Sequence, residues 1–121
     1  MERDYKLSKE AFRETIWFIR QSEDYKREYR SKIDLRGNGF EIKRGSGHSD
    51  PTFEAVRRTE KIKGKIDAIE KGFSLIPEEY RKGLFDNIIK DRPYPDYAHT
   101  STWKRWKRRL IWYIYNEKEG I

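Results

Sequence analysis

Residues 50–73 read DPTFEAVRRTEKIKGKIDAIEKGF, the most regular apolar pattern in the chain. Small or apolar side chains recur in it at alternating spacings of four and three: Ala55, Thr59, Ile62, Ile66, Ile69 and Phe73. This period places them on one face of an α-helix of about five turns. Asp50 and Pro51 predict its start, because a carboxylate caps free N–H groups and proline has none to leave unpaired. Gly72 predicts its C-terminal end.

Two more helices are expected downstream. Pro77, followed by two glutamates, predicts the start of one helix, since acidic side chains favour the positive end of the helix dipole. Its core-facing side chains are Ile76, Tyr80, Leu84, Phe85 and Ile88. The two prolines in residues 91–95 must break that helix. The last helix is then capped by Thr100, Ser101 or Thr102 and runs to about Tyr115.

Upstream, two helices and a loop are expected. Ser8 is a good N-cap for a helix with the apolar stripe Phe12, Ile16 and Ile19. A second cap in residues 21–24 starts another helix, although one bent helix fits the pattern equally well. Residues 36–49, RGNGFEIKRGSGHS, contain four of the eight glycines and lack an apolar period, which predicts a flexible loop.

The chain therefore reads as all-α, a small bundle of about four to five helices in a single domain over residues 1–121. It divides into N-terminal helices (1–35), a flexible glycine-rich loop (36–49) and a helical core with a basic C-terminal helix (50–121). Hydrophobic residues make up only 35% of the chain, but aromatic ones reach 15%. We expect an aromatic core, made of Trp103, Trp106, Ile62, Ile66, Tyr80 and Leu84.

The composition argues against several function classes. The chain has no cysteine, which excludes disulfides, thiol catalysis and cysteine-ligated zinc. Its two histidines, His48 and His99, lie 51 positions apart and form no metal-binding motif. No apolar run is long enough for a transmembrane helix or a signal peptide. We expect a cytoplasmic protein of a bacterial host cell with no enzymatic activity, no metal and no cofactor.

Charge is concentrated near the C-terminal end. The net charge is +7, and residues 98–121 contribute six basic and two acidic groups. Within them, WKRWKRR (residues 103–109) contains five cations: Lys104, Arg105, Lys107, Arg108 and Arg109. A solvated helix face is one interpretation. The other is a nucleic-acid-binding surface, because cations so close together repel one another unless a polyanion neutralises them.

The last fifty residues have the outline of a helix-turn-helix, whose second helix enters the major groove of DNA. The motifs IPEEY (76–80), YPDYA (94–98) and STWKR (101–105) resemble region 4 of sigma factors. The whole chain is similar in outline to small RinA-type phage activators, which regulate late transcription. The resemblance implies a DNA-binding, sigma-like transcription regulator of phage or mobile-element origin. It also implies duplex DNA as a partner, with phosphate or base contacts from Lys104, Arg105, Arg108 and Arg109.

The spacing differs from that family, because only residues 99–102 separate Ala98 from Trp103. Either the turn is rebuilt, or the fold is reused without DNA recognition. Host RNA polymerase or another host protein complex is a further candidate partner, and the 51–73 helix permits a dimer. One rival hypothesis is a non-enzymatic inhibitor of a host or anti-phage nucleic-acid-binding complex, such as an anti-CRISPR. Another is a phage structural or packaging protein.

Overall fold

The computed structural model describes residues 5–39 and 50–120, with side chains for 5–33 and 53–120. Within these residues the chain forms five helices and no strand, which confirms the all-α class. In chain order they are α1 (Lys9–Arg20), α2 (Ser22–Gly39), α3 (Asp50–Ser74), α4 (Glu78–Ile89) and α5 (Thr100–Glu119). None of the helices in this described part is long and apolar enough to cross a membrane.

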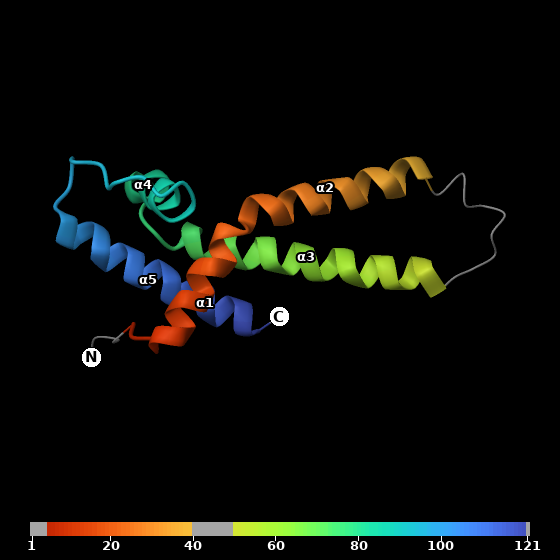
Figure 1. Cartoon of the computed structure of the whole chain (residues 1–121), viewed down its shortest axis with the longest axis horizontal. Coiled ribbons are helices and arrows are strands. Elements are labelled where there is room, and N and C mark those ends of the chain that lie inside the picture. Colours follow the sequence, from red (N-terminus) through yellow and green to blue (C-terminus); the bar gives the residue numbers. More distant parts are fainter. Residues whose placement is uncertain (1–4, 40–49, 121) are drawn as a thin grey trace.

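The helices form a head and a projecting arm (Figure 1). The arm is the antiparallel pair of α2 and the N-terminal two-thirds of α3, residues 22–39 and 50–66. The head contains residues 5–21 and 67–120, with α1 crossing α5 and α4 lying beside the N-terminal half of α5. Because α3 is one continuous helix, its N-terminal part belongs to the arm and its last turns pack in the head.

One apolar cluster fills the head. Its buried members come from α1, the end of α3, the α3–α4 connection, α4 and α5: Ile19, Ile69, Ile76, Leu84, Ile88, Trp103, Leu110, Ile111 and Ile114. Tyr80 and Trp106 are partly buried and pack against this cluster, as expected. The expectation for Ile62 and Ile66 is wrong: they are buried, but they lie outside the cluster. The reason is the length of α3, which carries these two residues into the arm.

The N-terminal pattern forms two helices rather than one bent helix. Ser8 caps α1 by accepting a hydrogen bond from the N–H of Ala11 at 3.1 Å, as the sequence predicts. Gln21 is the C-cap of α1, and α2 begins at the next residue. The loop boundary at residue 36 is wrong, because α2 continues to Gly39. Each helical glycine costs about 1 kcal/mol, but an established helix gains one hydrogen bond per added residue. Residues 40–49 lie outside the described part.

The ends of α3 and α5 also differ from the sequence prediction. Gly72 does not end α3; it is buried within the helix, where an added Cβ would collide with Ile114 of α5. The glycine therefore allows a close crossing of α3 and α5. The expected cap of α5 at residues 100–102 is wrong as well. His99 is the N-cap, because its Nδ1 accepts from the N–H of Ser101 at 3.1 Å, and α5 extends to Glu119.

Candidate nucleic-acid interface

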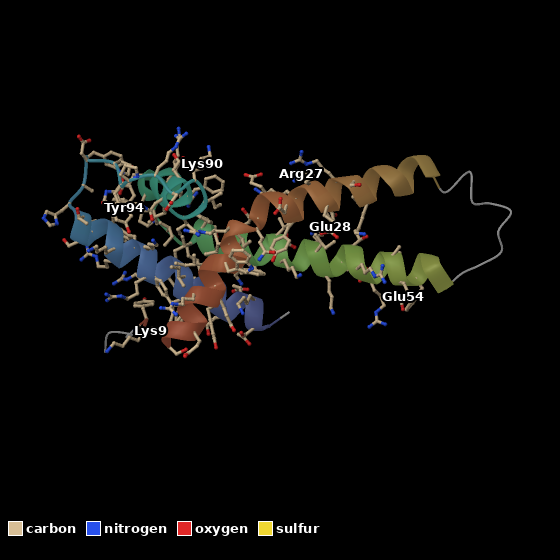
Figure 2. The ribbon with its side chains drawn as sticks, viewed as in Figure 1. Lys9, Arg27, Glu28, Glu54, Lys90 and Tyr94 are labelled. Carbon is tan, nitrogen blue, oxygen red and sulfur yellow. The ribbon has the colours of Figure 1, made fainter. Side chains whose placement is uncertain are left out.

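Trp103 fixes the position of α5, the helix that carries the predicted site. Its side chain is fully buried, and its indole Nε1 donates a hydrogen bond to the carbonyl of Pro95 at 2.9 Å. The Tyr94 ring stacks parallel to the indole, with 5.8 Å between the ring centroids. Figure 2 labels Tyr94 between α4 and the start of α5. Tyr80 and Tyr97 approach the same indole edge-on, at 5.1 and 5.4 Å. This packing holds the N-terminal half of α5 firmly against the head.

Three of the five cations that the sequence assigns to nucleic-acid binding project into solvent from the N-terminal half of α5. Lys104, Arg105 and Arg108 are exposed. Their spacing of one, three and four residues places them on one side of α5. Within the described residues none of the three has a hydrogen bond or an ion pair. The structure therefore presents three cations without an internal counter-ion on a rigid helix.

Lys107 is turned toward the protein, so the five cations do not form the one solvent-exposed surface that the nucleic-acid-binding interpretation expects. Its ammonium donates a hydrogen bond to Asn87 Oδ1 on α4 at 3.0 Å. Burial lowers the pKa of Lys107 from its usual 10.5, and the nearby Arg20 lowers it further, while Asp91 opposes the shift. On α5, Lys107 follows the buried Trp103 by four residues, so it lies at the edge of the core face.

Arg109 is also engaged within the chain. Its guanidinium lies over the ring of Tyr5 at 4.8 Å and over the ring of Trp106 at 5.1 Å. A cation between two aromatic faces gains electrostatic attraction from both rings. Tyr5 also contacts the rings of Trp112 and Tyr113, so the segment before α1 covers this side of α5. Arg109 is therefore less available to a partner than the three exposed cations.

The connection between α4 and α5 is longer than the turn of a helix-turn-helix. It occupies residues 90–99, whereas that motif uses three or four residues. Asp96 and Tyr97 form a turn in this segment and Ala98 a bend, and neither belongs to a helix. The Tyr97 hydroxyl donates to the carbonyl of Glu79 at 2.6 Å and ties the segment to the start of α4. The helix pair is thus joined by an anchored loop.

The described residues offer little support for a metal site or a small-molecule pocket. No group of three or more histidine, aspartate or glutamate side chains there could hold a metal ion. His99 is occupied as a helix cap, and His48 lies outside the described part. A shallow groove of about 410 Å³ lies where α1, α2, α3 and α5 meet. Trp17 lines it and is 64% exposed, but the groove also contains both Glu14 and Lys65, so it favours no single charge of ligand.

Comparisons with known proteins add nothing to this geometry. No family model, no curated protein and no solved structure matches the chain.

Sequence reasoning did not include Arg20, which lies beside Lys107. Arg20 is the last residue of α1 and stands 87 positions before Lys107 in the chain. The sequence offers one local signal, a basic residue in the last turn of an amphipathic helix. That signal does not reveal which other helix the residue meets.

Proposed function

We propose that the chain is a DNA-binding regulator without catalytic activity, and that α5 presents its phosphate-binding surface. The observation that carries this proposal is the exposed set Lys104, Arg105 and Arg108, which has no internal counter-ion among the described residues. Such a set raises the free energy of the isolated protein through mutual repulsion, and a polyanion relieves that repulsion. The resemblance to sigma region 4 points to the same partner and to transcription as the process.

Two features support DNA rather than a flexible or single-stranded polyanion. The three cations lie on a straight, well-packed helix, and a helix is the element that fits the major groove. Trp103 and Trp106 are engaged in packing with Tyr80 and do not form an exposed stacking surface for unpaired bases. The long α4–α5 connection suggests that the groove is entered without a standard helix-turn-helix.

The test is a salt titration of binding to duplex DNA. Each phosphate contact should contribute about −0.9 to the slope of log affinity against log salt. Lys104→Ala and Arg108→Ala should each reduce the steepness of that slope by about one unit. Lys61→Ala is the matched control, because Lys61 is an exposed lysine of α3 and the substitution changes the net charge equally.

Two results would contradict the proposal. One is a dissociation constant for duplex DNA weaker than about 10⁻⁴ M at physiological salt. The other is an equal loss in all three variants, which would indicate a response to net charge alone. In either case a protein partner would be the better hypothesis. Tight capture of a single host protein that requires Arg105 and Arg108 would then support the rival inhibitor function.

A further inference from the structure

Arg20 presents an oriented guanidinium at the junction of α1, α4 and α5. Its Nε donates a hydrogen bond to the carbonyl of Ile88, in the last turn of α4, at 3.0 Å. The two terminal amino groups of the guanidinium make no hydrogen bond in the described part of the chain, and the side chain is 47% exposed. An arginine anchored through Nε loses little further freedom when its terminal groups bind an anion. The guanidinium of Arg20 is therefore already oriented to bind an oxyanion before any ligand arrives.

Lys107 supplies a second oriented cation at the same place. Asn87 Oδ1 accepts one of its three N–H donors, which leaves two for another acceptor. The acceptors that hold the two cations, Ile88 and Asn87, are consecutive residues of α4, and the Arg20 charge helps to lower the pKa of Lys107. Two half-buried cations side by side are unfavourable unless something negative lies between or beside them. Their placement is typical of an anion-binding site.

Within the described residues, Asp91 is the only acidic side chain that interacts with Arg20 and Lys107. Its carboxylate lies 4.0 Å from an Arg20 terminal nitrogen, and its side chain is 92% exposed. An exposed ion pair at that distance contributes little stability. Asp91 is thus loosely held and easily displaced, but it lies where an incoming anion would approach Arg20.

We propose that Arg20 and Lys107 bind one phosphate group, and that the Asp91 carboxylate stands in for it in the free protein. This inference rests on the proposed function, which makes the DNA backbone the source of the phosphate. Lys104 and Arg108 neighbour Lys107 on α5, three residues before it and one after it. The phosphate site therefore extends the basic surface of α5 onto α1.

A simpler role for Arg20 is to satisfy a carbonyl at the C-terminal end of α4. Two substitutions separate the roles. Arg20→Gln removes the charge and should reduce the steepness of the salt slope for duplex DNA by about 0.9. Asp91→Asn removes the competing carboxylate and should strengthen DNA binding severalfold. Asparagine also tolerates the left-handed backbone at this position, where φ is 57°, so the variant keeps the test valid even if Arg20→Gln fails to fold.

Asp96→Asn is the matched control for Asp91→Asn. Asp96 is exposed in the same connecting segment, has no ion pair among the described residues, and gives the same change in net charge. Equal effects of the two substitutions would overturn the inference, because general charge would then explain both. A wild-type slope in Arg20→Gln, with losses in Lys104→Ala and Arg108→Ala, would overturn the inference and leave the proposed function standing.

Inorganic pyrophosphate separates the phosphate site from its DNA source. In an NMR titration of the full chain, it should shift the amide signals of Asp91 and Lys107, and the shifts should be lost in Arg20→Gln. If duplex DNA does not bind but these shifts occur, the phosphate site stands and the proposed function falls. If neither pyrophosphate nor duplex DNA shifts these amide signals, the site itself is refuted.

Discussion

Gly83 is the residue on which the packing of Trp103 depends. It is buried within α4, and a Cβ built on it would lie 2.5 Å from Cη2 of the indole and 2.8 Å from Cζ3. Pro95 Cδ would be 3.1 Å away. The indole is fully buried and hydrogen-bonded, so it has no free direction in which to move. Even one methyl group has no room here.

Gly83→Ala should therefore destabilise the fold. Alanine gains about 1 kcal/mol in helix propensity, but overpacking a filled core costs about 1–3 kcal/mol, and a rigid neighbour favours the upper part of that range. Gly120→Ala is the control, since its Cβ would meet nothing closer than 3.5 Å. Urea unfolding of both variants measures the difference. If Gly83→Ala is as stable as the wild type, Trp103 does not pack against α4 as described.

The residue scale is also where the sequence predicted least. It identified five cations on α5 but could not distinguish the outward ones from Lys107 and Arg109. That distinction depends on Asn87 of α4 and on Tyr5 of the N-terminal segment, whose contacts with α5 arise only in the folded chain. Arg20 was missed for the same reason. Helical spacing shows which side chains share a face, but it does not show what covers that face.

At the scale of elements, the arm is the least supported part of the fold. Apart from Ser22, where the arm joins the head, the buried side chains of the arm in the described residues are Thr59, Ile62 and Ile66. The ion pairs there join neighbours on one helix, such as Arg27 with Asp24 and Arg58 with Glu54, and not one helix to the other. Figure 2 shows Arg27 and Glu54 on the outer sides of the arm. Surface pairs of this kind add little stability.

We expect the arm to open separately from the head. Ile62→Ala removes apolar contact worth about 2–5 kcal/mol at a fully buried site, so it should speed hydrogen exchange in residues 22–33 and 53–66. Exchange in α4 and α5 should stay at the wild-type rate. Ile111→Ala, at a fully buried site of the head, should instead speed exchange throughout the head. Faster exchange in α5 of Ile62→Ala would show that arm and head unfold as one unit.

The elements themselves were largely predictable, because their signals are local. The start of α1 at Ser8 and the break at the two prolines follow from capping and from the backbone of proline. The end of α3 and the cap of α5 did not follow. Glycine is typical of a helix end, but Gly72 instead allows α3 to pass close to Ile114 of α5. His99 is an uncommon capping residue, and three better ones come directly after it.

At the scale of the whole molecule, the arm makes the chain extended. A compact domain of this length has a radius of gyration of about 14 Å. Since α2 and α3 project together from one side of the head, small-angle X-ray scattering should give a clearly larger value and an elongated distance distribution (Figure 1). The measurement needs a dilution series, because self-association raises the same quantity. A value near 14 Å at low concentration would mean that the arm folds back onto the head.

The arm also changes how the predicted dimer should be considered. The sequence suggested self-association because residues 51–73 carry an isoleucine stripe. In the fold, α2 covers that stripe within one chain, and Ile62 and Ile66 are buried there. Neither composition nor periodicity distinguishes an apolar face covered by the same chain from one covered by a second copy. The dimer remains a prediction that the same dilution series examines.

The burial of Trp103 also gives the protein an internal optical reporter. Its indole lies in a dry setting among Tyr80, Tyr94 and Tyr97, whereas Trp17 is 64% exposed to solvent. Among the four tryptophans, Trp103 should therefore give the bluest and most iodide-resistant emission, and Trp17 the reddest and most readily quenched. Excitation of the surrounding phenol rings should transfer energy to Trp103 over about 5 Å. Loss of that transfer would signal that α5 has left the head, without any label attached to the chain.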